Sequence, residues 1–294
     1  MRIFITGTTG FLGQQLSNSL LKKGHKIGTL ARNVAKSDRA IASNTESMIE
    51  GEKHKGISYY FGDLTDYLNI QDVLTNFKPD VIIHLAAQTS VAYSFTHTTE
   101  VFNVNFLGVV NMAEAARRVL PKLKRFIFSG SVEEYGIQTK FPTKETCNFP
   151  VQTSLYGASK ISAEALIQAY SEGYNIKSYI FRFVSILGER YSHGHVFDFT
   201  KQLIKNKKKL VVLGNGKQTK SYLNVKDCIE AIWISLKFFK SKVNIINLGT
   251  NEFCTVKQSA NWIAQNMSLK PKFHYLGGKR GWIGDSPFIY LDTK

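Results

Sequence analysis

The chain has 294 residues, of which 43% are hydrophobic and 20% are charged, and six are prolines. This balance excludes a disordered or fibrous protein and suits one large or two modest domains. Lys and Arg number 38 against 22 Asp and Glu, so the net charge of +16 favours anionic partners. The densest basic run, residues 205–209, lacks the interleaved aromatic residues of a single-strand binder, and we do not expect nucleic acid to be the partner.

Cysteine usage and hydrophobicity exclude further classes of protein. Cys147, Cys228 and Cys254 are far apart and have no metal-binding spacing, so we expect neither a metal site nor a disulfide framework. No apolar stretch approaches the ~20 residues of a membrane span. The apolar N-terminus is interrupted at Thr6 and Gly7, too early for a signal peptide. We therefore expect a cytoplasmic protein with no membrane partner.

Short apolar segments alternate with helical patterns through the first two thirds of the chain. We expect strands at Ile3–Thr6, Lys26–Leu30, Ser58–Gly62, Val81–Leu85, Phe126–Ser129 and Ser178–Val184. We expect helices at Phe11–Lys23, Tyr67–Asn76, Val101–Leu120 and Tyr156–Glu172. This alternation predicts an α/β fold with a doubly wound parallel sheet.

The regular alternation stops near Leu187. Beyond a stretch rich in Gly and Lys, the pattern predicts the helix Val225–Lys237, the strand Val243–Leu248 and the helix Val256–Met267. We expect a large sheet domain and a small discontinuous domain, formed by residues 1–187 with 223–251 and by residues 188–222 with 252–294. The polar residues 33–56 are expected to form a surface excursion.

A glycine-rich loop joins the first predicted strand to the first predicted helix. Gly7 permits a tight turn, Gly10 lets the backbone approach a pyrophosphate, and Gly13 allows the helix to pack closely on the sheet. The N-terminus of the helix that follows favours negative charge. In this strand–loop–helix context the three glycines predict a dinucleotide-binding site.

The end of the second predicted strand bears on the choice of cofactor. A carboxylate at this position would bind the free ribose 2′-hydroxyl of NAD, but residues 30–33 contain none. Arg32 can instead hold the 2′-phosphate of NADP through charge-assisted hydrogen bonds. The sequence therefore favours NADP, and NAD remains possible.

A tyrosine and a lysine mark the start of a later predicted helix. Tyr156 and Lys160 are four residues apart, so their side chains share one helix face. A phenol with a pKa of ~10 is a poor acid–base catalyst at neutral pH, and a nearby ammonium stabilises its phenolate. Ser131 follows a buried predicted strand, where its hydroxyl can reach the same reacting oxygen as Tyr156.

Together these motifs resemble those of the extended short-chain dehydrogenase/reductases, and among them the nucleotide-sugar epimerases, dehydratases and 4-keto-6-deoxy sugar reductases. The resemblance covers residues 1–188 and implies a Rossmann-like fold, NAD(P)-dependent chemistry and a nucleotide-diphosphate sugar as partner. It also implies a homodimer, since members of the family often pair the helices expected here at 101–120 and 156–172. The implied catalytic residues are Ser131, Glu133, Tyr156 and Lys160.

The same resemblance implies which residues contact the cofactor and the substrate. The cofactor-binding residues would be Gly7, Thr9, Gly10, Phe11, Leu12, Gly13, Arg32, Asp63, Leu64, Leu85, Ala86, Ala87, Gln88, Asn105, Ser129, Tyr156 and Lys160. Ser185 stands where the family usually has an asparagine. The candidate substrate contacts are Ser90, Ser131, Ser185, Arg190, His195, Lys201 and Arg280.

Three reactions are open, all beginning with hydride exchange at C4 of a nucleotide-linked hexose. In 4,6-dehydratases a Thr-Asp-Glu or Thr-Ser-Glu triplet supplies a second acid–base group. The corresponding residues here are Ser131, Val132 and Glu133, and the valine side chain cannot transfer protons. The dehydratase triplet is therefore only partly matched.

Residues 131–136 favour one of the remaining reactions. They read Ser-x-Glu-Glu-Tyr-Gly and resemble GDP-4-keto-6-deoxymannose reductases. With Arg32, this makes an NADPH-dependent 4-keto-6-deoxy sugar reductase our first hypothesis. A 4-epimerase, whose tails resemble residues 277–285, and a 4,6-dehydratase are the alternatives. The intact pair of Tyr156 and Lys160 argues against a non-enzymatic cofactor-binding protein.

Overall fold

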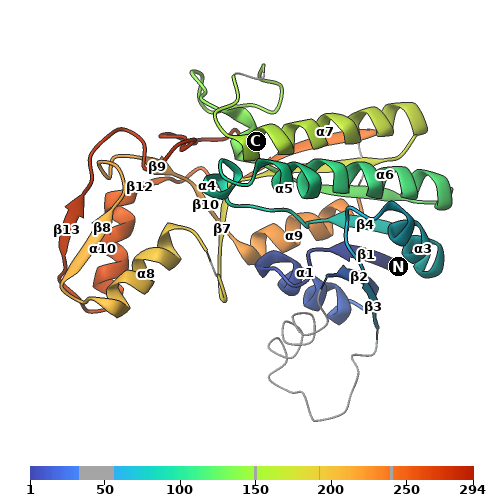
Figure 1. Cartoon of the computed structure of the whole chain (residues 1–294), viewed down its shortest axis with the longest axis horizontal. Helices are drawn as coiled ribbons and strands as arrows, with labels where there is room; N and C mark the ends of the chain where they lie inside the picture. Colours follow the sequence, from blue (N-terminus) through green and yellow to red (C-terminus); the bar gives the residue numbers. More distant parts are fainter. Residues whose placement is uncertain (33–55, 149–150, 192, 239–240) are drawn as a thin grey trace, which may run out of the picture.

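A seven-stranded sheet organises most of the molecule (Figure 1). The computed structural model describes residues 1–32, 56–148, 151–191, 193–238 and 241–294. All neighbouring strands of this sheet are parallel, in the order β11-β6-β5-β4-β1-β2-β3. Their bounds are β1 Arg2–Thr6, β2 Lys26–Ala31, β3 Ile57–Phe61, β4 Val81–His84, β5 Arg125–Ser131, β6 Ser178–Phe183 and β11 Val243–Leu248. The predicted Rossmann-like α/β fold is thereby confirmed.

Both faces of this sheet are covered, because side chains alternate along each strand. Ile3 and Ile5 of β1 belong to the apolar core under α1 (Phe11–Lys22) and α9 (Val225–Ser235). Phe4, between them, belongs to the core on the opposite face. There α3, α6 and α7 pack, with bounds α3 Tyr67–Phe77, α6 Gly108–Val119 and α7 Leu155–Tyr174.

The helix expected at 101–120 is interrupted. The structure has α5 (Thr98–Phe102), a π-helical turn η1 (Asn103–Leu107) and then α6. The turn carries Asn105, which is buried and hydrogen-bonded at both its amide nitrogen and its amide oxygen. A π-helical turn adds residues to one turn of a helix. The hydrophobic pattern of the sequence predicts a helix but does not show such an irregular turn.

A second, smaller group of elements has an apolar core of its own. Helices α8 (His195–Lys205) and α10 (Val256–Asn266) pack together, and β8 (Lys209–Val212) pairs with β13 (Lys272–Tyr275). Short pairs join the chain segments, with bounds β7 Ser185–Leu187, β9 Thr219–Lys220, β10 Tyr222–Asn224 and β12 Cys254–Thr255. The domain boundaries expected from the sequence stay predictions.

The final residues of the chain return to the large sheet. Leu291 lies in the core beneath α1 and α9, and the backbone of Thr143 bonds to those of Tyr290 and Asp292. The polar excursion expected at 33–56 lies outside the described residues except for Gly56. Of the helices that the structure describes, none is long and apolar enough to cross a membrane. Within the same part of the chain, no group of three or more His, Cys, Asp or Glu side chains could hold a metal ion.

Phe77, at the end of α3, anchors this helix to the sheet. Its ring is 1% exposed and lies 5.9 Å from that of Phe4 and 6.3 Å from that of Tyr60, between ring centroids. Phe77→Ala should lower the free energy of unfolding by about 3–5 kcal/mol, because it leaves a cavity. Leu68 is 69% exposed on the same helix, so Leu68→Ala should change it by less than about 0.5 kcal/mol. Urea unfolding monitored by circular dichroism measures both, and equal effects would contradict this packing.

Candidate active site

A cleft of about 1220 Å³ runs along the carboxyl edge of the large sheet. It lies where the chain, after building β2 and β3 on one side of β1, crosses over to start β4 on the other side. Open α/β sheets bind their ligands at such switch points, since the loops there separate. The opposite wall of the cleft comes from the smaller group of elements, including side chains of α8 such as His195 and Lys201.

The glycine-rich loop closes one end of the cleft. Gly7 has a φ of +79°, and a Cβ added to it would lie 2.8 Å from the backbone nitrogen of Ala86. A Cβ on Gly13 would lie 2.2 Å from the carbonyl oxygen of Gly7, so neither position has room for a side chain. Helix α1 begins directly after Gly10, with no acidic residue in its first turn. The positive end of the helix dipole therefore faces the cleft unneutralised, which fits the pyrophosphate of a dinucleotide.

Most of the other predicted cofactor residues line the same cleft. They are Thr9, Phe11, Leu12, Arg32, Asp63, Leu64, Leu85, Ala86, Ala87, Gln88 and Ser129. Asn105 does not line it and supports it from behind: its Oδ1 accepts from the backbone nitrogen of Gln88 at 2.7 Å, and its Nδ2 donates to Ser159 Oγ at 3.0 Å. Asn105 thus ties the loop after β4 to helix α7.

Arg32, which directly follows strand β2, also lines the cleft. Its side chain is 63% exposed, and Nη1 lies 4.0 Å from Oδ2 of Asp63. Asp63 in turn accepts from the backbone nitrogen and the hydroxyl of Thr65, each at 2.9 Å, so it also stabilises a turn. An exposed guanidinium that is held this loosely can still turn toward an anionic group.

Tyr156 and Ser131 converge on the middle of the cleft. Tyr156 lies in the first turn of α7, where the Ser154 side chain caps the helix, and Ser131 is the last residue of β5. Burial raises the pKa of Tyr156, the charges of Glu134 and Glu133 add to this, and a hydrogen bond with Ser131 lowers it. The two hydroxyls are thus paired at a surface of the cleft, where a reacting oxygen can meet both.

Lys160 lies one turn after Tyr156 on the same helix. It is 1% exposed, and its Nζ lies 4.2 Å from the centre of the Phe128 ring. Burial lowers the pKa of Lys160 to about 8, and the carboxyl groups of Glu134 and Glu164 oppose this shift. At neutral pH the side chain is therefore predominantly an ammonium, and it lines the same cleft as Tyr156.

Glu133 also lines the cleft, and its Oε2 atom is buried with no hydrogen-bond partner among the described residues. Burial raises the pKa of Glu133, and nearby Asp285 adds to the shift. Lys220 and Ser286 act in the opposite direction. A carboxyl group at the cleft surface can bind a hydroxyl-bearing ligand.

Lys220 is a cleft residue that the sequence motifs did not single out. Its Nζ donates to Asp285 Oδ1 and to the carbonyl oxygen of Ser286, both at 2.7 Å, and it lies 5.7 Å from the centre of the Trp282 ring. Lys220 and Asp285 are 65 residues apart, so only the fold brings them together.

The predicted substrate residues divide into two groups. Ser90, Ser131, Ser185, His195 and Lys201 line the cleft, whereas Arg190 and Arg280 are not among its described lining residues. Burial lowers the pKa of His195 to about 4, and Lys220 adds to this, so the imidazole is neutral at pH 7. Its Nε2 lies 2.9 Å from Ser259 Oγ and 3.1 Å from the Tyr222 hydroxyl.

The chain matches the model of the NAD dependent epimerase/dehydratase family over residues 3–249. Protein CapI of Staphylococcus aureus is 30% identical over 234 residues, which cover 79% of this chain and 68% of that protein. UDP-glucose 4-epimerase of Mycolicibacterium smegmatis is 32% identical over 237 residues, covering 79% and 72%. The crystal structure of a UDP-galactose 4-epimerase matches with a TM-score of 0.81 at 26% identity, over 100% of this chain and 90% of that one.

The chain therefore belongs to the NAD dependent epimerase/dehydratase family. It is an enzyme of the extended short-chain dehydrogenase/reductase type that acts in nucleotide-sugar metabolism, as the motifs predicted. Its cofactor is a nicotinamide dinucleotide, and the glycine loop described above has the shape to hold one.

Proposed function

We propose that this enzyme exchanges a hydride between the nicotinamide dinucleotide and C4 of a nucleotide-linked hexose, with Tyr156 as the acid–base group. The observation that carries this proposal is the convergence of Tyr156, Ser131 and Lys160 on one wall of the cleft. The bound nicotinamide gives or accepts the hydride. The residues of the chain orient the sugar and move the proton.

Each of these residues has one task in the proposed reaction. In the direction of reduction, C4 of the keto sugar receives the hydride, and the Tyr156 hydroxyl gives its proton to the O4 oxygen. Ser131 donates a hydrogen bond to the same oxygen, where negative charge develops. Lys160 stabilises the phenolate that remains on Tyr156. In the reverse direction the phenolate takes the proton back from the C4 hydroxyl.

The finer reaction that we propose is the reduction of a 4-keto-6-deoxy sugar with NADPH. Arg32, at the adenosine end of the cleft, supports NADPH, because its guanidinium is available to a 2′-phosphate. Val132 argues against a 4,6-dehydratase, since this step needs a proton-transferring side chain beside Glu133. Lys220 and Lys201 are the proposed contacts for the substrate diphosphate, because both place an ammonium on the cleft wall.

A 4-epimerase is the second candidate, and similarity to known proteins favours it. One relative at 32% identity is a UDP-glucose 4-epimerase. An epimerase would use the same Tyr156, Ser131 and Lys160 for oxidation and for reduction, and it would keep NAD bound throughout. The homodimer and the cytoplasmic location expected from the sequence stay predictions.

The role of Tyr156 is tested by removing its hydroxyl. Tyr156→Phe should bind cofactor but lose turnover by about 100-fold or more, which is the scale of general acid catalysis. The substrates are nucleotide-linked hexoses and their 4-keto-6-deoxy forms, with NADPH or NADH, followed by the nicotinamide absorbance and by chromatography of the sugars. Oxidation of NADPH by a 4-keto sugar indicates the reductase, and interconversion of two 4-hydroxy sugars without net absorbance change indicates the epimerase.

Tyr174 provides a matched control for this test. It lies on the same helix as Tyr156 and is 54% exposed, so Tyr174→Phe should leave turnover unchanged. Near-normal turnover of Tyr156→Phe would refute the proposed acid–base role.

The proposed preference for NADP depends on Arg32. Charge-assisted hydrogen bonds to a 2′-phosphate are worth about 1.5–3 kcal/mol each, so NADP should bind at least ~10-fold more tightly than NAD. Arg32→Asp should invert this order, because a carboxylate repels the phosphate and accepts from the free 2′-hydroxyl. Isothermal titration calorimetry with each dinucleotide measures both affinities.

Lys242→Asp makes the same change of charge at an exposed position, where Lys242 pairs only loosely with Glu172, at 3.9 Å. It should leave the ratio of the two affinities unchanged. Equal affinities for NAD and NADP in the unmodified protein would rule out the role given to Arg32 and would favour the epimerase.

A further inference from the structure

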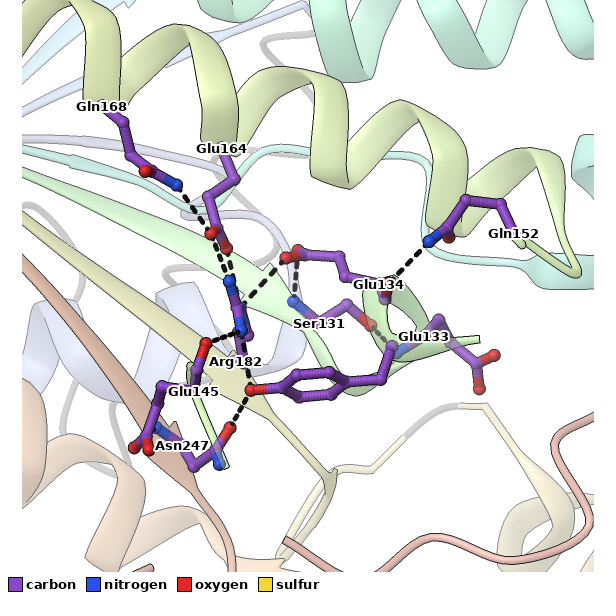
Figure 2. Close-up of polar contacts among 10 residues, drawn as sticks. Ser131, Glu133, Glu134, Glu145, Gln152, Glu164, Gln168, Arg182 and Asn247 are labelled. Atoms are coloured by element: carbon purple, nitrogen blue, oxygen red, sulfur yellow. Dashed lines mark hydrogen bonds and ion pairs between the residues drawn. The ribbon is translucent and has the colours of Figure 1, made fainter. Parts of the chain in front are cut away.

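A group of buried ionisable side chains, Arg182, Glu164 and Glu134, lies next to Ser131 (Figure 2). Arg182 of β6 forms a two-pronged ion pair with Glu164 of α7: Nε donates to Oε2 at 2.9 Å and Nη2 to Oε1 at 2.5 Å. The same guanidinium has its Nε 3.5 Å from Oε2 of Glu134. All three side chains are at most 1% exposed.

Glu134 connects this ion pair to the backbone of Ser131. It lies in the short 3-10 helix η2 (Val132–Tyr135), and its carboxylate turns back so that Oε1 accepts from the Ser131 backbone nitrogen at 2.7 Å. The Ser131 hydroxyl in turn accepts from the Glu133 backbone nitrogen at 3.2 Å. One carboxylate thus contacts Arg182 with one oxygen and holds Ser131 with the other, as Figure 2 shows.

The surrounding chain is arranged around this carboxylate. A Cβ added to Gly130 would lie 3.0 Å from Oε1 of Glu134, so the glycine leaves the space that the carboxylate occupies. The next residue, Tyr135, is also held by the guanidinium, since its hydroxyl accepts from Arg182 Nη1 at 2.7 Å and donates to Asn247 at 2.6 Å. Arg182 therefore restrains two successive residues of the turn that follows Ser131.

Stability alone does not account for a carboxylate in this place. Moving a charged group out of water is costly, and replacing buried ion pairs by apolar side chains of similar size is often neutral or stabilising. Glu164 already accepts two hydrogen bonds from Arg182, so Arg182 has a counter-charge without Glu134. What Glu134 adds is a hydrogen bond to the backbone of Ser131, whose side chain pairs with Tyr156.

We propose that Glu134 is a positioning residue, which holds Ser131 against Tyr156 by linking the Ser131 backbone to the Arg182–Glu164 ion pair. This inference rests on the proposed function, because it assigns Ser131 a part in the reaction. A displacement of a reacting group by about 1 Å can cost about 100-fold in rate, so a hydrogen bond at this position affects turnover.

Three substitutions of Glu134 separate the effect of its side-chain length from the effect of its carboxyl group. Glu134→Gln keeps a carbonyl oxygen that can accept from Ser131 but removes the titratable carboxyl group, whose pKa burial and Glu164 raise. Glu134→Asp keeps the carboxyl group but is one methylene shorter, so it no longer reaches Ser131. Glu134→Met fills a similar volume and provides neither.

If Glu134 positions Ser131, kcat should depend on whether the side chain at position 134 can reach the Ser131 backbone nitrogen. The Gln variant should stay within about 5-fold of the unmodified enzyme, whereas the Asp and Met variants should lose about 10- to 100-fold in kcat with KM within about 3-fold. Glu172→Gln, on the exposed end of α7, should leave all constants unchanged. If Glu134→Asp retained activity and Glu134→Gln lost it, the proposal would be overturned in favour of a purely electrostatic role for Glu134. Normal kcat in both Asp and Met would also overturn it.

A double-mutant cycle tests whether Glu134 acts through Ser131. Ser131→Ala should itself lower kcat by about 10- to 100-fold, and adding Glu134→Asp to it should cost less than about 3-fold more. A full additional loss would mean that the two residues act independently and would refute the proposal. Because the Asp variant keeps the charge beside Arg182, the cycle does not depend on whether the Met variant folds.

Hydrogen exchange of residues 129–135 gives a readout that needs no substrate. The Ser131 amide should stay protected in the Gln variant and exchange faster in the Asp and Met variants, and equal protection in all of them would overturn the proposal. If Tyr156→Phe and Ser131→Ala keep normal turnover, the proposed function fails, and this inference fails with it. If both lose turnover while Glu134→Asp does not, only the positioning role fails.

Discussion

The ion pair between Arg182 and Glu164 fixes helix α7 against the sheet, and the geometry of the site depends on it. Tyr156, Lys160 and Glu164 follow one another at intervals of four residues, so they form a single stripe along α7. The ion pair between Glu164 and Arg182 of β6 holds this stripe against the sheet, between β5 and β6. A buried pair of this kind contributes little net stability, but removing one partner would leave a charge buried and unpaired. The pair therefore specifies one register of helix on sheet.

The charge of the cleft suits the ligands proposed for it. The N-terminus of α1 and the side chain of Arg32 lie toward the cofactor end, and Lys160, Lys201 and Lys220 line the remaining walls. The buried carboxyl group of Asp285 is paired with Lys220 at 2.7 Å. A dinucleotide and a nucleotide-diphosphate sugar both carry negatively charged phosphates, which basic side chains attract. The positive charge along the cleft has the same sign as the net charge of +16.

Local sequence patterns were enough to predict the sheet and the end of the cleft that holds the glycine loop. Ile3, Phe4 and Ile5 show the apolar character of a strand buried on both faces, and Gly10 and Gly13 both lie close to the carbonyl oxygen of Gly7 within the same loop. These features are set by neighbours in the chain, which is why the printed order of residues reveals them.

The features that the sequence did not reveal depend on contacts between distant segments. In the π-turn at 103–107, Asn105 is hydrogen-bonded to Gln88, which belongs to a different loop. Lys220 is held in the cleft by its hydrogen bond to Asp285. Nothing in the local sequence distinguishes Glu134 from other acidic residues, because its partner Arg182 is 48 positions later in the chain. The placement of Arg190 and Arg280 outside the described lining has the same origin, since the path of a loop decides where its side chains lie.

We propose that Lys160, a buried ammonium on α7, is the counter-charge of Tyr156 during the reaction. Burial lowers the pKa of Lys160 to about 8, so the ammonium is present below this pH and is lost as the pH rises through it. The most direct measurement is the pH dependence of kcat between pH 6 and 10, with circular dichroism confirming that the fold persists, in the unmodified enzyme and in Lys160→Met. The account predicts that kcat of the unmodified enzyme falls above a pH of about 8, and that this decline is absent from the low residual rate of the methionine variant. A rate that stays constant to pH 10, or a methionine variant with the same decline, would contradict it.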